Sequence, residues 1–215
     1  MLLLYFLGAG LLLGLLTRGR LTGLAEVEFR WWPLALGGLA FQALLFSDFL
    51  GGQVGDAGPA MYVASTLVVL VGLARNLDLV GFPVIAVGAA LNLLAIVANG
   101  GLMPADPAAL AAVFGTPAVP TDLFSNSQLI GPATYLPFLG DVFVLTRPLP
   151  FANVFSIGDV LIGAGAVLFI VWAMHRRSAA PPAPAAAPVP AHATEESMAA
   201  RLGELGRIAG GAHGH

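Results

Sequence analysis

The sequence predicts an all-α integral membrane protein, a five-helix transmembrane bundle with a long structured extracytoplasmic loop and a flexible cytoplasmic tail. Composition is the first observation: of 215 residues, 58% are hydrophobic and 10% are charged, whereas soluble domains average about 45–50% apolar residues. Long apolar runs recur through the first 175 residues. The arginines gather in alternate connections between these runs, as they do in multi-pass membrane proteins.

Five apolar stretches approach the roughly 20 residues that a helix needs to cross about 30 Å of hydrocarbon. These stretches are Leu2–Leu16, Trp31–Phe46, Ala57–Ala74, Leu77–Ala98 and Ser156–Met174. The first lacks the basic start and the small-residue cleavage site of a signal peptide, so we expect it to be retained. Small residues at Gly10 and Gly14, and at positions 163–166, should let the first and last helices pack closely against their neighbours.

Basic residues orient the bundle, because short cytoplasmic loops carry the excess of them. The arginines that define one side are Arg18, Arg20, Arg30, Arg75, Arg176 and Arg177. The amino terminus is therefore expected outside a bacterial plasma membrane and the carboxyl terminus in the cytoplasm. Aspartates then collect on the outer side, at Asp48, Asp56, Asp106, Asp122, Asp141 and Asp159. Carboxylates have little effect on membrane insertion, which would be enough to explain why they collect there. Alternatively, the aspartates form a site for a cation or for acid–base chemistry.

Three segments follow from the composition along the chain. Residues 1–177 form the transmembrane domain, whose outer loop, 99–155, is too long for an ordinary connection and should contain structure. Within it, Asp106 as N-cap, Pro107 and Gly115 predict a short helix. Residues 178–193 are a Pro/Ala-rich linker, and residues 194–215 are a cytoplasmic tail. An apolar stripe over residues 194–208 indicates either a short helix that docks on a membrane or cytoplasmic protein partner, or marginal disorder.

Candidate site residues are the few polar groups close to the apolar stretches. Asn92 and Asn99 lie two turns apart in the fourth stretch, where they either bond to neighbouring helices or line a polar binding vestibule together with Arg147 of the loop. Asp159 begins the last helix, where it either caps that helix or meets Asp141. A close carboxyl pair would share a proton and divide into an acid and a base.

Missing residue types exclude several kinds of chemistry. The chain has no Cys and no Lys, which excludes disulfides, thiolate metal sites and lysine Schiff bases. The four His fall at the inner edge or in the tail, so no Ser–His nucleophile is expected outside. We expect no metal site and no cofactor. Nucleic-acid binding is disfavoured because no basic patch with interleaved aromatic residues is present.

Three sequence blocks carry a resemblance to a known family: NGGLMP at Asn99–Pro104, FLGD at Phe138–Asp141 and VFSIGDVLIGAG at Val154–Gly165. With the apolar stretches around them, they resemble a family of uncharacterised bacterial multi-pass membrane proteins, a domain of unknown function, over roughly residues 1–175. The resemblance implies the fold and no assigned activity.

A local similarity over about 30 residues is to lipoprotein signal peptidase, a membrane aspartyl protease. That family begins its last helix with a Phe-Asn-x-Ala-Asp block, and its other catalytic Asp lies about 20 residues earlier. Ser156 stands where that family has Asn, and the block around Asp141 is reduced to Leu-Gly-Asp. This similarity implies Asp141 and Asp159 as catalytic residues.

The expected function is non-enzymatic: a membrane subunit, scaffold or binding protein. The shortage of ionisable groups in the apolar stretches argues against a proton-coupled transporter. The alternatives are an intramembrane aspartyl hydrolase that uses Asp141 and Asp159, and a carrier of neutral lipid or of a small apolar substrate. The lipid bilayer is the expected general partner.

Overall fold

The computed structural model describes residues 2–47, 49–50, 53–115, 126–176 and 198–205. The chain divides into two units, Met1–Arg177 and Ser178–His215, and each is described by itself. In the second unit, residues 198–205 form a helix with exposed side chains. The linker expected at 178–193 and the rest of the helix expected within 194–208 lie outside the described residues, as do Asp48 and Asp122.

Helices dominate the first unit. The long ones are α1 (Leu2–Leu16), α3 (Trp32–Leu45), α4 (Gly58–Ala74), α5 (Phe82–Ala98) and α7 (Ile157–His175), with short turns at α2 (Thr22–Ala25) and η1 (Gly55–Ala57). The predicted apolar stretches and these helices coincide to within two residues, except that α5 begins at Phe82 rather than at Leu77. Gly81 precedes it in the left-handed conformation, φ +88°, which ends the preceding turn and starts the helix afresh.

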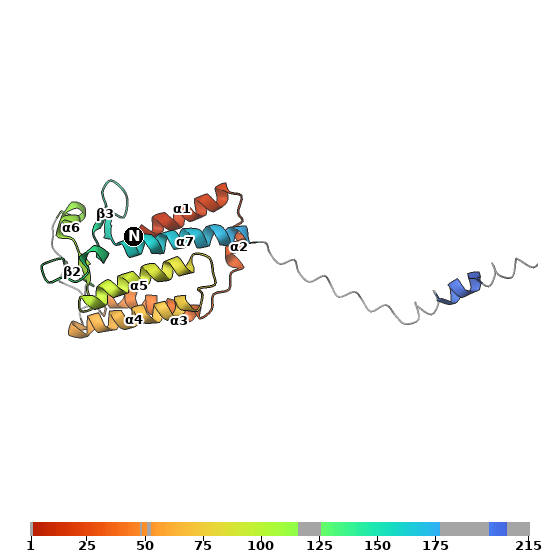
Figure 1. Cartoon of the computed structure of the whole chain (residues 1–215), viewed down its shortest axis with the longest axis horizontal. Coiled ribbons are helices and arrows are strands. Elements are labelled where there is room, and N and C mark those ends of the chain that lie inside the picture. Colours follow the sequence, from red (N-terminus) through yellow and green to blue (C-terminus); the bar gives the residue numbers. More distant parts are fainter. Residues whose placement is uncertain (1, 48, 51–52, 116–125, 177–197, 206–215) are drawn as a thin grey trace, which may run out of the picture. The chain divides into compact units, whose positions relative to one another are not determined.

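The long helices pack mainly in the order α1, α7, α5, α4, α3. Figure 1 shows them side by side, with α2 at one end and α6, β2 and β3 at the other. Glycines make the closest approaches possible, as expected. Gly10 lies against Ile170, Gly163 lies against the ring of Phe6 and Gly165 lies against Ile85.

Residues 99–115 and 126–155 form a layer across one end of the bundle, which we call the loop layer. It contains β1 (Met103–Ala105), α6 (Pro107–Phe114), β2 (Ser127–Leu129), η2 (Pro137–Leu139), β3 (Phe143–Leu145) and β4 (Asn153–Phe155). The helix expected after Asp106 is confirmed: the Asp106 side chain accepts hydrogen bonds from the backbone at its start, and Gly115 closes it at φ +78°.

The strands of the loop layer correct the expectation of an all-α chain. β1 pairs in parallel with β2, with Met103 opposite Ser127, and β3 pairs antiparallel with β4, with Phe143 opposite Phe155. Each strand is three residues long, too short to show the alternation by which a strand is recognised in a sequence.

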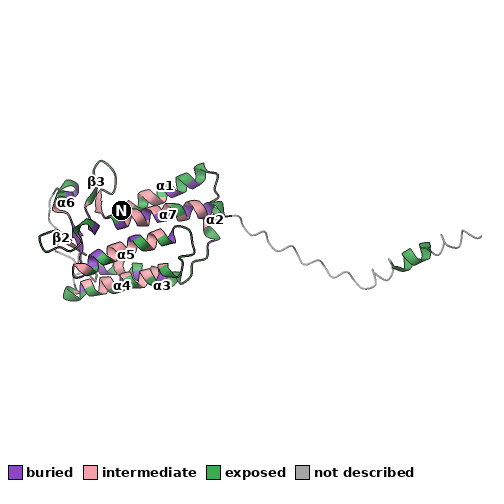
Figure 2. Ribbon diagram, in the orientation of Figure 1, coloured by how far each residue is buried: buried purple, intermediate pink, exposed green. Residues whose placement is uncertain are grey.

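A small apolar core joins the loop layer to the bundle. Ala95 and Ile96 at the end of α5 pack against Met103 of β1 and Leu139 of η2. Buried residues in Figure 2 include this junction and the contact between α5 and α7. The loop layer is therefore fixed to the helix ends.

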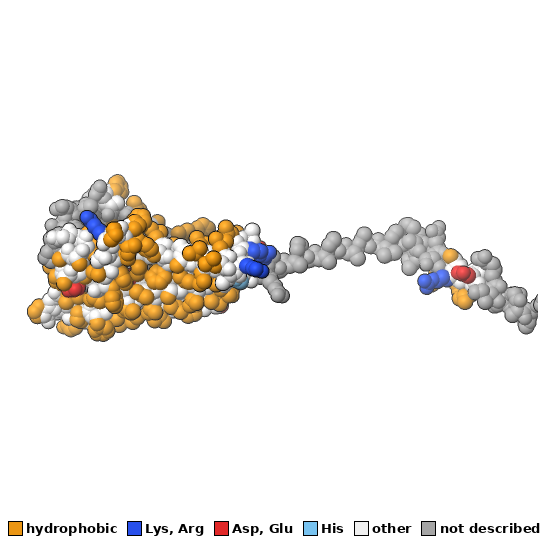
Figure 3. Space-filling view, turned by 90° about the horizontal axis from the view of Figure 1, so that it is seen from above, with side chains coloured by type: hydrophobic (Ala, Val, Ile, Leu, Met, Phe, Trp, Pro, Cys, Tyr) orange, Lys and Arg blue, Asp and Glu red, His pale blue; other side chains and the backbone are white. Residues whose placement is uncertain are grey.

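Along the helices, by contrast, large apolar side chains remain exposed. Leu16 is 71% exposed, Leu36 54% and Leu94 51%, and hydrophobic atoms cover most of the helical surface in Figure 3. Among the described residues, two helices are long and apolar enough to cross a membrane: Gly55–Ala74, which joins η1 and α4, and Ile157–His175. The described part of the chain is thus mostly helical, with two candidate membrane-spanning helices.

Candidate functional site

A network of three polar side chains closes the start of α7 against α5. Ser156 and Asp159 form a capping box: the Ser156 hydroxyl accepts from the Asp159 backbone N–H at 3.1 Å, and Asp159 Oδ2 accepts from the Ser156 N–H at 3.0 Å. Asn92 of α5 completes the network, because its Nδ2 donates to Asp159 Oδ1 at 2.9 Å and its Oδ1 accepts from Ser156 Oγ at 2.8 Å. Both oxygens of Asp159 are therefore engaged.

Asn92 reaches this network because the two helices nearly touch there. A Cβ added to Gly88 would lie 2.9 Å from the backbone nitrogen of Ile162, and one added to Gly158 would overlap Asn92. Glycine at both positions brings the α5 side chain to the amino end of α7. That end carries a partial positive charge, which favours the carboxylate of Asp159 there.

Asp141 lies in the loop layer directly after η2. Its backbone N–H donates to Pro104 at 2.7 Å and its carbonyl oxygen accepts from Asp106 at 3.1 Å, which ties it to the end of β1. Burial of its carboxyl group, and secondly the negative charge of Asp159, raise its pKa from 3.8 to about 7. Close to neutral pH the carboxyl group therefore exists as a mixture of acid and carboxylate.

The two aspartates interact electrostatically without sharing a proton directly. No hydrogen bond joins their carboxyl groups in the part of the chain that the structure describes. Both charges also act on the hydroxyl of Tyr62 in α4, whose side chain is hydrogen-bonded to Asn126. The structure thus gathers Asp141, Asp159 and Asn92 at one end of the bundle, with Asp159 holding a helix end and Asp141 available to titrate.

Asn99 fastens the loop layer instead of facing the other polar residues. Its Nδ2 donates to the carbonyl oxygens of Ala95 and Tyr135, both at 2.8 Å, and its Oδ1 accepts from the Tyr135 N–H at 2.9 Å. Arg147 lies exposed in the turn between β3 and β4. The ion pair found among the described residues joins Arg30, which precedes α3, to Asp78, which lies between α4 and α5.

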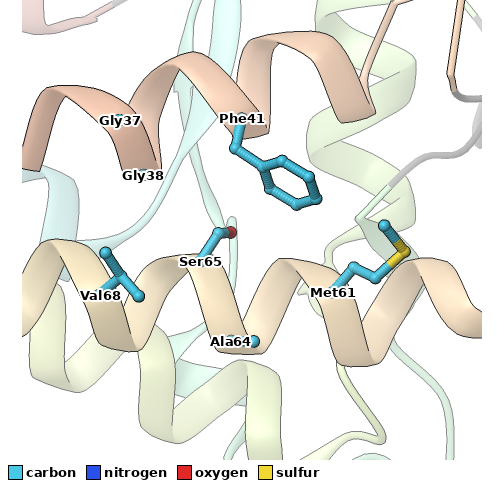
Figure 4. A pocket seen from close by; sticks show the side chains of 7 residues that line it. All are labelled: Gly37, Gly38, Phe41, Met61, Ala64, Ser65 and Val68. Atoms are coloured by element: carbon cyan, nitrogen blue, oxygen red, sulfur yellow. The ribbon is translucent and has the colours of Figure 1, made fainter. Parts of the chain in front are cut away.

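Two hollows flank α4, and neither is lined by the polar network. One of about 340 Å³ lies between α3 and α4, where Phe41 and Met61 face each other beyond Ser65 (Figure 4). The other, about 480 Å³, lies between α4 and α5, with Asp56 on its lining. Within the described residues, no group of three or more His, Asp or Glu is placed to hold a metal ion.

Sequence reasoning did not single out Ser156, Tyr62 or Asn126 as partners of the aspartates. The Ser-x-x-Asp spacing of Ser156 and Asp159 is the signal that would have identified the capping box. No comparable signal exists for Tyr62 and Asn126, because they meet only through the fold.

No curated protein and no solved structure matches the chain. A family model does match residues 26–171, which contain the polar network, Asn99, Asp141 and Arg147. The chain therefore belongs to the family of unknown function DUF5317.

Proposed function

We propose that the chain is a multi-pass protein of the bacterial plasma membrane and acts there as a non-enzymatic scaffold or binding subunit. All five long helices cross the bilayer in this proposal. The single observation that supports a non-catalytic role is the engagement of Asp159, whose two oxygens are used to cap α7 and to bind α5. Asp159, Asn92 and Ser156 thus serve to join α5 to the start of α7.

Exposed apolar surface supports the membrane placement. Soluble monomers rarely expose contiguous apolar patches beyond a few hundred Å², whereas α1, α3, α4, α5 and α7 all carry large exposed apolar side chains. The 14 residues of α3 measure about 21 Å, less than the roughly 30 Å of hydrocarbon. Exposed Trp31 and Phe46 at its ends extend its apolar length, and local thinning of the bilayer absorbs the remainder.

Charged and aromatic residues support an orientation with the amino terminus outside. Arg75 lies 4.1 Å from the ring centre of Trp31 and Arg176 lies 5.0 Å from that of Trp172. Both pairs belong at a membrane boundary on the arginine-rich, cytoplasmic side. The loop layer is then outside, where it offers a surface to a partner, and the helix within residues 198–205 lies in the cytoplasm as a second contact.

Labelling of single cysteines tests the topology, because the natural chain has none. Cysteine at position 147 should react with an impermeant thiol reagent added to intact cells, and cysteine at position 75 should react only after permeabilisation. The reverse pattern would overturn the orientation. Release of the chain from membranes by alkaline carbonate would overturn the membrane placement itself.

Variants of the aspartates test the role. Under the scaffold proposal, Asp159→Asn lowers the amount of folded protein, because the substitution removes an acceptor from the capping box. Host growth or envelope integrity should then fall in proportion to that amount. A variant at normal abundance with complete loss of the host phenotype would contradict a scaffold.

An aspartyl hydrolase is the second candidate, favoured by one observation: Asp141, with its pKa raised to about 7, lies within the electrostatic reach of Asp159. A general acid is most effective with a pKa near the working pH. For this function, Asp141→Asn and Asp159→Asn must each abolish the phenotype at undiminished membrane abundance. Retained phenotype in Asp141→Asn excludes it.

A further inference from the structure

Three arginines lie at the end of the bundle opposite the loop layer, where the turn after α1 packs against the last turn of α7. The backbone N–H of Arg20 donates to the carbonyl oxygen of Met174 at 2.7 Å, and its Nη2 donates to that of Arg176 at 3.3 Å. Arg18 lies two residues earlier in the same turn. We call Arg18, Arg20 and Arg176 the arginine corner.

The corner is held in place by close backbone contacts. A Cβ added to Gly19 would lie 2.8 Å from Met174 Cβ, and one added to Gly23 would overlap the carbonyl oxygen of Ala173. A ring nitrogen of His175 contacts the carbonyl oxygen of Thr17 at 3.0 Å. The turn is therefore pressed against α7, and the bases of the arginine side chains have fixed positions.

Positive charge accumulates in the corner, and the acidic residues nearest to its turn along the chain, Glu26 and Glu28, follow α2. All three arginines are exposed, and within the described residues no ion pair within 4.0 Å involves any of them. The carboxyl end of α7 supplies only about half a negative charge. Guanidinium groups at one end of the bundle repel one another, so an anion bound there would stabilise the corner.

The surroundings select the kind of anion. Trp172 lies beneath the Arg176 guanidinium, and Leu16, 71% exposed, continues the apolar surface of α1 directly up to the corner. Guanidinium groups bind phosphate oxygens through paired hydrogen bonds, while Trp favours the level of lipid headgroups. A ligand that matches both has a phosphate joined to acyl chains.

We propose that the arginine corner binds the phosphate of an anionic phospholipid, whose acyl chains lie along α1 and α7. The proposal rests on the membrane placement given above. Blue side chains in Figure 3 gather at the end of the bundle where α7 finishes, next to the hydrophobic belt. This lipid would hold the turn after α1 against the end of α7.

Native mass spectrometry of the full chain in detergent tests the proposal, with equal amounts of phosphatidylglycerol and phosphatidylcholine added. Wild-type protein should retain phosphatidylglycerol preferentially. Arg18→Gln and Arg176→Gln should each reduce that preference about fivefold, about 1 kcal/mol, because each variant loses the contact of one guanidinium group with the bound phosphate. Arg18→Lys, which keeps the charge, should reduce it less. The matched control is Arg75→Gln, which should leave the preference unchanged, because Arg75 is an exposed arginine at the same end of the bundle but follows the last residue of α4.

If Arg75→Gln reduces the preference for phosphatidylglycerol as much as Arg18→Gln does, the effect is one of general charge and the proposal is wrong. The proposal is also wrong if the wild-type protein shows no preference. Unchanged thermal unfolding of Arg18→Gln without lipid shows that the variant is folded. Carbonate extraction separates the two proposals. If the chain stays in the membrane but shows no lipid preference, the lipid-binding proposal is wrong and the membrane placement stands.

Discussion

Substitution of Asp141 by Asn should stabilise the protein at alkaline pH and remove the part of the pH dependence of its stability that Asp141 contributes. Burial and the charge of Asp159 raise the pKa of Asp141 from 3.8 to about 7 in the folded chain. The folded state therefore binds a proton more tightly than the unfolded state. The contribution of Asp141 to the free energy of unfolding is therefore complete below pH 3.8, and it is lost as the pH rises from 3.8 to about 7.

The size of the effect follows from these two pKa values. Each unit of difference corresponds to about 1.36 kcal/mol, so that the free energy of unfolding should fall by about 2–3 kcal/mol between pH 5 and pH 8. Asn carries no charge at either pH, and Asp141→Asn should show little of this fall. For a unit of this size the difference amounts to about 5–10 °C in the midpoint of thermal unfolding at pH 8.

Thermal unfolding in one detergent, from pH 5 to pH 9 at a fixed scan rate, measures this prediction. Asp56→Asn is the matched control, because Asp56 is an exposed carboxylate on the same side of the bundle, and it should retain the wild-type slope. Parallel pH profiles of wild type and Asp141→Asn would refute the reasoning. A lower midpoint for Asp141→Asn at pH 8 would refute it as well.

Three further substitutions probe the contacts that hold the unit together. Asn92→Ala leaves the α7 capping box without its α5 partner and should cost about 1–3 kcal/mol, a drop in thermal midpoint that an unchanged unfolding curve would contradict. Gly163→Val places a side chain against the ring of Phe6 and should lower the free energy of unfolding by about 1–3 kcal/mol. The control Gly8→Val has open space around it and should not lower it. Equal thermal midpoints for the two variants would count against close packing of α1 on α7. Asn99→Ala should speed proteolysis of the loop layer by removing three hydrogen bonds, and cleavage at the wild-type rate would argue that the small apolar core alone holds it.

Local signals account for the parts of the fold that the sequence predicts well. The helices follow apolar runs, and the short helix after Asp106 follows the combination of an N-cap, a proline and a terminal glycine. The start of α5 was placed too early because Leu77 and Leu79 are apolar, although Gly81 interrupts the helix. The strands carry no such signal, because pairing partners, not their three-residue sequences, define them.

The sequence predicts the candidate site only where its residues are close neighbours along the chain. Asp159 at a helix start could be recognised from its own neighbours. Its bond to Asn92 spans 67 positions in the chain, and a spacing of that kind gives no information on contact. Asn92 and Asn99 lie on one helix, yet one binds α7 and the other binds the loop layer, since helix position does not say which neighbour lies opposite.

Asp159 and Asp141 interact electrostatically but have different roles, and the backbone around each explains the difference. Asp159 is part of the first turn of a long helix, where N–H groups without helical partners and the helix dipole favour negative charge. Asp141 has its backbone committed to β1, and burial of its carboxyl group raises its pKa. The negative charge at the start of α7 in turn raises the pKa of Asp141 further. Because the carboxylate that caps α7 also contributes to the raised pKa of Asp141, the ionisation of Asp141 is linked to the charge at the start of α7.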